Sequence, residues 1–308
     1  MNSVLNKPTK KLLREFLGSH YQCTLVAEGA NAFGYKINNY HQEFFLKVYK
    51  GDDYHHRYQR EIFFYTTFGE VIDAQATLIA SSNEAKCLLL RFFKGARLNA
   101  VSEDYVKSAV KFFEKLNAQD VNSKMPLAAE PAFAITDFHA IVQRRIESEV
   151  FYISNIMDCV NQVSKALSDI KIDKYDLPVN KIYSPSDFGV HNTLFSGNKY
   201  YFIDFEYAGI DSYWKFLCDF FAQPEFPIPL EMLRTFQRSS TWRRENLNVD
   251  ALSIAYRMTL LKWVLLILST GIRLKKDPEI YIGQAEQYFE EIEPKVSAFY
   301  SKLDGKKL

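Results

Sequence analysis

The spacing of apolar residues along this chain changes near residue 95. Between residues 21 and 93, apolar and polar positions alternate in short runs, which is typical of β-strands, and helical spacing is confined to residues 9–17 and 58–65. From Glu103 onward, apolar residues recur at helical spacing, over residues 106–116, 138–170, 214–221, 230–237, 252–269 and 281–300. The sequence therefore predicts an α+β protein, with a strand-rich segment at 1–95 and a mostly helical segment at 96–308.

One charged residue lies inside the strand predicted over residues 43–49. A period of two places Phe45, Lys47 and Tyr49 on one face of this strand. A lysine in the middle of a strand is costly to bury unless it is paired. Glu61, on the helical segment that follows, is the natural partner. We therefore predict a Lys47–Glu61 pair that presents the ammonium group to the phosphates of a nucleotide.

A second group of polar residues lies between residues 187 and 204. Asn192 follows Asp187 by five positions, and Asp204 ends the apolar run 199–203. The turn at 196–198 predicts a hairpin of residues 193–195 and 199–203, which brings Asn192 and Asp204 together. Phosphoryl transfer from a magnesium nucleotide needs a base for the acceptor hydroxyl and ligands for the metal. We predict Asp187 as the base and Asn192 and Asp204 as the metal ligands.

The tripeptide at residues 187–189 also has the letters of the metal-binding Asp-Phe-Gly of protein kinases. In that register a catalytic aspartate with an asparagine five residues later should lie upstream. The nearest candidate, Asp176, has Lys181 at that spacing. The register with Asp187 as the base is complete, and we adopt it.

These motifs resemble those of the aminoglycoside phosphotransferases and choline kinases, small-molecule kinases with a protein-kinase-like fold. The similarity runs over nearly the whole chain and is most specific at residues 187–192 and 203–209. The resemblance implies a two-lobe fold, with a small β-rich, nucleotide-binding N-lobe over 1–95 and a larger, mostly helical C-lobe over 96–308 that carries the catalytic loop and the acceptor site. It also implies ATP or GTP and Mg²⁺ as cofactors.

The same resemblance implies further nucleotide contacts in the N-lobe. The strand-turn-strand pattern of residues 26–37 contains Gly29 and Gly34, where backbone N–H groups would face phosphate oxygens. Residues 88–95 match the family's last N-lobe strand and hinge, so that the backbone at Phe93 would meet the base.

One departure from the family concerns the residues before the catalytic aspartate. The family usually has His-Gly there, whereas this chain has Pro185 and Ser186. The family's histidine braces the loop and does no chemistry, so Asp187 keeps its predicted role. Proline fixes its own φ and can stiffen the loop in another way.

The acceptor is predicted to be a small molecule. Helical spacing resumes by Trp214, which leaves no room after Asp204 for the segment that holds peptide substrates in protein kinases. We predict that Glu206, Asp211, Trp214 and Trp263 line the acceptor pocket. Two carboxylates without a metal role favour an acceptor that carries an amine over a neutral sugar, unless a basic residue such as Arg257 neutralises them.

Two alternatives to a small-molecule kinase belong to other classes of function. A catalytically inactive nucleotide-binding scaffold is suggested by the irregular Pro185-Ser186, and a protein kinase is disfavoured by the missing activation segment.

Composition limits the partners and the cellular compartment that we expect for the protein. The net charge of the 308 residues is +1, which gives no reason to expect nucleic acid or an anionic membrane as a partner. Four separated cysteines in apolar segments are typical of buried thiols in a reducing compartment. The N-terminus has no apolar signal core, and the apolar run around 260–272 contains Lys262, so we predict a core helix there and a cytoplasmic protein. The sequence does not indicate an oligomeric state.

Overall fold

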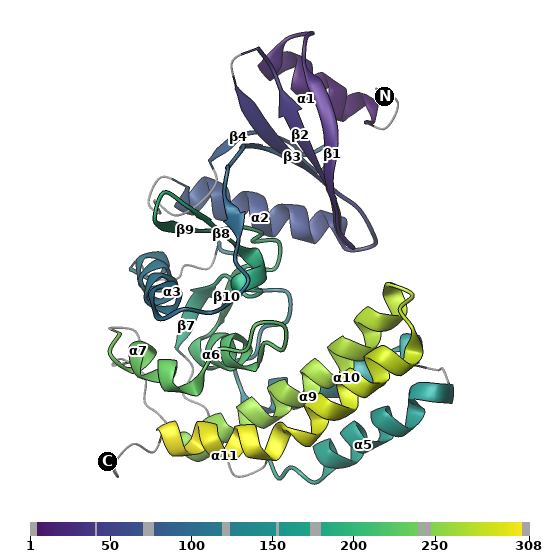
Figure 1. Cartoon of the computed structure of the whole chain (residues 1–308), viewed down its shortest axis with the longest axis vertical. Coiled ribbons are helices and arrows are strands. Elements are labelled where there is room, and N and C mark those ends of the chain that lie inside the picture. The colour runs from purple at the N-terminus through teal and green to yellow at the C-terminus, as the bar shows by residue number, and fades with distance from the viewer. Residues whose placement is uncertain are drawn as a thin grey trace. The chain divides into compact units, whose positions relative to one another are not determined.

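A computed structural model of the chain describes residues 5–40, 42–69, 77–118, 124–151, 154–172, 180–239, 242 and 248–303 (Figure 1). The chain forms two compact units. Unit 1 consists of Met1–Asn99, Asn122–Ala129 and Pro185–Gly209, and unit 2 of Ala100–Val121, Glu130–Ser184 and Ile210–Leu308. Asp176, the candidate catalytic aspartate of the rejected register, lies outside the described residues.

Unit 1 contains a five-stranded antiparallel sheet with the order β1-β2-β3-β5-β4. Its strands are β1 (Gln22–Glu28), β2 (Ala32–Asn38), β3 (Glu43–Tyr49), β4 (Leu78–Ser82) and β5 (Cys87–Arg91). Helix α1 (Lys7–Leu17) packs against β4, and α2 (Tyr54–Phe68) connects β3 to β4 and contacts both strands. The side chain of Asn6 caps α1 by accepting the N–H of Thr9 at 2.9 Å.

The two faces of β3 have different neighbours. Phe44 and Leu46 belong to the apolar core that α1 closes with Leu12 and Leu13. The opposite face carries Lys47, which lies across from Gly34 on β2 and from Leu88 on β5. The alternation along the strand thus separates the core side from the polar side, as predicted from the period of two.

A short hairpin adds a second sheet to unit 1. Strands β8 (Thr193–Ser196) and β9 (Lys199–Phe202) pair with each other, and β6 (Ala96–Arg97) pairs with β8. Gly197 and Asn198 both have positive φ, +54° and +61°, as a two-residue type I′ turn requires. The predicted hairpin is therefore present. It belongs to unit 1, which differs from a simple division at residue 95, because β6 ties it to the N-terminal segment.

Unit 2 is mostly helical. Its helices are α3 (Glu103–Leu116), α4 (Ile135–Ile146), α5 (Met157–Ser168), α6 (Tyr213–Ala222), α7 (Leu233–Gln237), α9 (Val249–Arg273), α10 (Pro278–Glu290) and α11 (Ile292–Leu303). Single 3₁₀ turns occur at η1 (Glu149–Phe151), η2 (Ser154–Ile156) and η4 (Leu230–Met232), and a two-stranded sheet joins β7 (Lys181–Ser184) to β10 (Gly209–Ser212). A further turn, η3 (Val190–Asn192), lies in unit 1.

Helix α9 is the centre of unit 2. It contacts α4, α6, α10 and α11, and Figure 1 shows α10 and α11 running beside it. With 25 residues it is longer than predicted, and it is long and apolar enough to cross a membrane. Because 72% of its most apolar window is buried inside the structure, its apolar surface is accounted for by packing, as expected for a core helix.

Candidate active site

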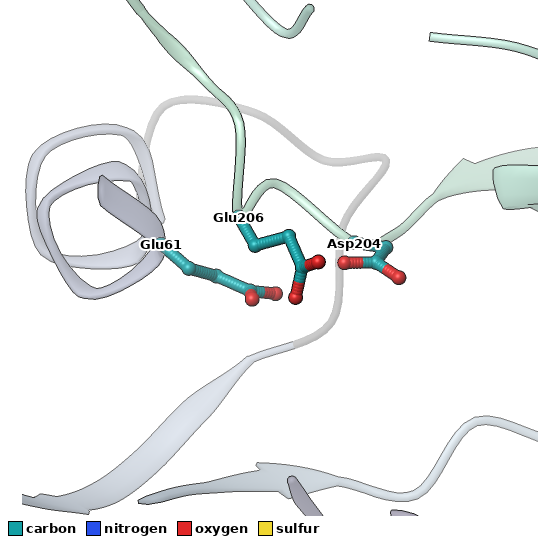
Figure 2. A group of neighbouring side chains, drawn as sticks. All are labelled: Glu61, Asp204 and Glu206. Atoms are coloured by element: carbon teal, nitrogen blue, oxygen red, sulfur yellow. The ribbon is translucent and has the colours of Figure 1, made fainter. Parts of the chain in front are cut away.

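A buried lysine in unit 1 is surrounded by three carboxylates. Lys47 Nζ lies 2.6 Å from Glu61 Oε2, 2.6 Å from Asp204 Oδ1 and 3.0 Å from Glu206 Oε2. Glu61 projects from α2, whereas Asp204 and Glu206 follow β9 (Figure 2). The structure thus contains the predicted Lys47–Glu61 pair and adds Asp204, from the catalytic segment, to the same ammonium group.

Burial and the neighbouring carboxylates of this cluster both raise the pKa of Glu61. One oxygen from each of Glu61, Asp204 and Glu206 lies within 4.8 Å of one oxygen from each of the others. Burial raises the pKa of Glu61 to about 7; Lys47 opposes this shift, while Asp204 and Glu206 add to it. Burial would lower the pKa of Lys47, but the carboxylates of Asp204 and Glu61 outweigh burial and hold it well above its usual value. The lysine is therefore a fixed positive charge.

Neighbouring groups fix the carboxylates in place. Tyr49 donates its hydroxyl hydrogen to Glu61 Oε2, and the backbone N–H of Phe205 donates to Glu61 Oε1 at 3.3 Å. The rings of Phe205 and Phe64 stack with their centroids 3.7 Å apart, which attaches the Asp204 segment to α2. Asn31, in the β1–β2 turn, donates to Glu206 Oε1 and to the Tyr207 hydroxyl, both at 2.7 Å.

The loop that carries Asp187 is held by its own neighbours. His191 Nε2 lies 3.1 Å from Asp187 Oδ1, and Asn192 Nδ2 donates to the backbone oxygen of Asp187 at 2.8 Å and to Oδ2 at 3.3 Å. Ser186, directly before the aspartate, has φ +60°, and Asp204 has φ +68°. Non-glycine residues seldom adopt this conformation, and they cluster at functional sites.

The hairpin places Asn192 and Asp204 at the same end. The N–H of Ile203 donates to Asn192 O at 3.0 Å, so the two chain segments are bonded directly next to the predicted ligands. Because the Asn192 amide nitrogen is bonded to Asp187, its amide oxygen is the atom available to a metal. Asp204 supplies a carboxylate that is 40% exposed. Amide and carboxylate oxygens are the ligands that Mg²⁺ takes, so these residues fit the ion.

The predicted glycines have different local roles. The N–H of Gly29 donates to Ala32 O at 3.0 Å and closes the β1–β2 turn, so in this structure that group is used within the turn. Gly34 faces the side of the sheet that carries Lys47, where a Cβ would lie 2.7 Å from the ring of Phe45. Phe93 lies between β5 and β6, and its ring packs on Tyr201 with the centroids 3.8 Å apart.

The four predicted acceptor residues all have protein neighbours. Glu206 is bound to Lys47 and Asn31 in unit 1. In unit 2, Asp211 Oδ1 accepts the N–H groups of Ala132 at 2.9 Å and Ser212 at 2.8 Å, and Trp214 is 1% exposed. Trp263 is partly exposed and lines a groove of unit 2.

Three contacts were absent from the sequence-based prediction of the cluster. Glu206 binds Lys47, Asn31 binds Glu206, and Tyr49 binds Glu61. The position of Tyr49, two residues after Lys47 on the same strand face, was the signal that could have indicated its contact. Nothing in the sequence joins Asn31 to residue 206.

Comparisons with known proteins identify the fold. No protein-family model and no curated protein sequence matches the chain. The structure is similar to spectinomycin phosphotransferase APH(9)-Ia, solved with ADP and spectinomycin, at 14% identity and a TM-score of 0.59 over 98% of this chain and 99% of that one. It is similar to choline kinase from Cryptosporidium parvum Iowa II at 12% identity and a TM-score of 0.65, over 96% and 95% of the chains. The aminoglycoside phosphotransferase APH(2'')-Ib, bound to ADP, matches at 15% identity and a TM-score of 0.57, over 98% and 99%. The chain thus has the two-lobe, protein-kinase-like fold of these enzymes.

Proposed function

We propose, on the basis of this shared fold and the Lys47 cluster, that the chain is a small-molecule kinase. It would transfer the γ-phosphoryl group of ATP or GTP to a hydroxyl group of an amine-bearing or sugar-like acceptor. The observation that carries the proposal is the buried Lys47 ammonium between Glu61 and Asp204. A lysine–glutamate pair beside a metal-binding aspartate is the arrangement that phosphoryl transfer requires.

Each residue has a distinct task in the proposed reaction. Lys47, oriented by Glu61, binds phosphate oxygens of the nucleotide. Asp204 and Asn192 would hold Mg²⁺, which neutralises charge on the phosphates when it is bound. Asp187 accepts the proton of the acceptor hydroxyl while the acceptor oxygen bonds to the γ-phosphorus. The bond from that phosphorus to the bridging oxygen breaks, and the nucleoside diphosphate leaves.

The short connection after Asp204 supports a small acceptor. Residues 205–212 alone separate this aspartate from α6, and part of them forms β10. A peptide-binding activation segment has no place there, which disfavours a protein kinase. A cytoplasmic location accompanies this proposal as a prediction.

The first test is Asp187→Asn. Binding of a non-hydrolysable nucleotide with Mg²⁺, measured by calorimetry, should stay within a few-fold of wild type, while phosphorylation of the acceptor falls by about two orders of magnitude or more, because a positioned base contributes that much. Asp52→Asn, an exposed carboxyl of the same unit, is the matched control and should leave both unchanged. Equal losses of binding and turnover would make Asp187 a metal ligand instead.

The alternative is a catalytically inactive nucleotide-binding scaffold. Pro185 and Ser186 in place of His-Gly are the observation in its favour. A panel of aminoglycosides, amino alcohols and monosaccharides distinguishes the two. Nucleotide binding without turnover on any member would favour the scaffold.

A further inference from the structure

A groove of about 560 Å³ opens within unit 2. It lies among the segment after α6, the C-terminal half of α9, and helices α10 and α11. Its walls are aromatic and aliphatic, with Trp263, Tyr281 and Tyr288 among them, and its polar side chains include Gln284 and Gln287. This volume and composition are those of a small-molecule site.

The groove has balanced charges. Two glutamates and two lysines line it, namely Glu225, Glu291, Lys276 and Lys295. Lys295 Nζ lies 2.8 Å from Glu291 Oε2 and 4.0 Å from the centroid of the Tyr288 ring. The Tyr288 hydroxyl donates to the backbone oxygen of Ala222, so its ring is held in this orientation.

A carboxylate beside the face of an aromatic ring is the environment in which proteins bind the ammonium group of a ligand. In this chain, Lys295 places its own ammonium group there. An incoming amine would have to displace a covalently attached cation, whereas a neutral ligand would not. The amide groups of Gln284 and Gln287 can both donate to and accept from hydroxyl groups.

We propose that Lys295 is a specificity-determining residue, an internal cation that makes this groove select neutral, hydroxyl-rich ligands and exclude amines. That these ligands are phosphoryl acceptors rests on the proposed function. The two carboxylates that favoured an amine from the sequence, Glu206 and Asp211, both have protein partners, which agrees with a neutral ligand.

The binding test uses tetramethylammonium chloride as the probe, with sodium chloride at equal ionic strength as the reference. Calorimetry on the full chain should detect no saturable binding of tetramethylammonium to wild type. Lys295→Met should bind it saturably, at least ten-fold more tightly than the weakest binding that the measurement detects. Lys302→Met, on the same helix but paired with Glu231, is the matched control and should behave as wild type. Adding Glu291→Gln to Lys295→Met should remove the gain.

Tetramethylammonium binding of equal strength in wild type and Lys295→Met would overturn the proposal, and so would the absence of binding in both. Lys295→Gln provides a second variant if the methionine variant does not fold. Turnover on glucose and glucosamine forms an independent arm. The neutral sugar should be favoured by wild type and the amino sugar by Lys295→Met, and a wild-type preference for glucosamine would contradict the proposal. Lack of turnover on every acceptor, with the binding results intact, would count against the kinase function alone.

Discussion

His191 and Asn192 hold the two oxygens of the Asp187 carboxylate separately. His191 bonds to Oδ1, and the Asn192 amide bonds to Oδ2 and to the backbone oxygen. The residues directly before the aspartate are Pro185 and Ser186, and the contact to Oδ1 comes from His191, after the aspartate. The orientation of the proposed base therefore depends on a side chain four positions downstream.

This arrangement predicts a selective effect of changing His191. His191→Leu should lower kcat by about ten-fold or more, because a small misplacement of a catalytic group can cost up to about a hundred-fold, and the KM for nucleotide should change little. His191→Gln places an amide N–H near the position of Nε2 and should recover most of the loss. Steady-state kinetics on the three proteins provides the test. Equal losses in both variants would mean that the bond to Asp187 is not what matters.

Ser186 occupies a backbone conformation that suits glycine. Its φ of +60° lies in the left-handed region, which costs a non-glycine residue roughly 1–2 kcal/mol. Ser186→Gly should therefore leave the free energy of unfolding unchanged or raise it by up to about 1 kcal/mol, whereas Ser301→Gly, in the last turn of α11, should lower it by up to about 0.5 kcal/mol. Denaturant titrations compare the two variants. A loss of more than about 1 kcal/mol in Ser186→Gly would show that the serine side chain stabilises the loop.

At the scale of elements, α9 packs against α10 at a glycine. A Cβ added to Gly271 would lie 2.2–2.5 Å from Tyr281 atoms, whereas a Cβ at Gly283 on α10 would meet nothing within 4 Å. Helix propensity favours alanine at both positions by roughly 1 kcal/mol. Gly283→Ala should stabilise by up to that amount, and Gly271→Ala should destabilise by about 1–3 kcal/mol because its neighbour must move. Equal thermal unfolding temperatures for both variants would contradict this packing.

Asp211 lies directly before the residue that caps α6 and predicts a pH dependence. Burial raises its pKa to about 7, although Lys215 and the N–H groups of Ala132 and Ser212 oppose the shift. A raised pKa in the folded state adds stability while the group is protonated, and this stability is lost as the pH rises through 7. Between pH 6 and 8, wild type should lose about 1 kcal/mol relative to Asp211→Asn.

Asp169→Asn, which removes an exposed carboxyl after α5, is the matched control and should follow wild type over this range. Chemical unfolding at several pH values measures the difference. A constant gap between wild type and Asp211→Asn would mean that the carboxyl does not titrate there.

Some helices, strands and side-chain contacts could be predicted from the sequence, and others could not. The run 281–300 was predicted as one helix, but α10 ends at Glu290 and α11 begins at Ile292. The sequence did not indicate this break, because buried residues such as Tyr288, Ile292 and Val296 keep helical spacing across it. The hairpin and the Lys47–Glu61 pair were predictable from local spacing and a known pattern. The contact of Lys47 with Glu206 was not, since it joins positions far apart in the chain and depends on how the segment after β9 packs against α2 through Phe205 and Phe64.

Charge is distributed unevenly over the whole molecule. The chain has a net charge of +1, yet the three carboxylates around Lys47 outnumber the one ammonium group by two when all are ionised. Like charges at this separation repel strongly in a buried site. A divalent cation would offset this excess, which supports the proposed role of the cluster in holding Mg²⁺.

This excess of negative charge predicts that Mg²⁺ stabilises the protein. Mg²⁺ with a non-hydrolysable nucleotide should raise the unfolding temperature of wild type by several degrees, since saturation at a hundred times Kd adds about 2.7 kcal/mol. Asp204→Ala should reduce the shift and raise the Mg²⁺ concentration needed for turnover more than Asn192→Ala, because only the aspartate supplies a charge. Asp52→Asn should retain the full shift, as a carboxyl outside the cluster. Turnover that persists in excess chelator would exclude a metal from the reaction and leave the acidic cluster with a purely structural role around Lys47.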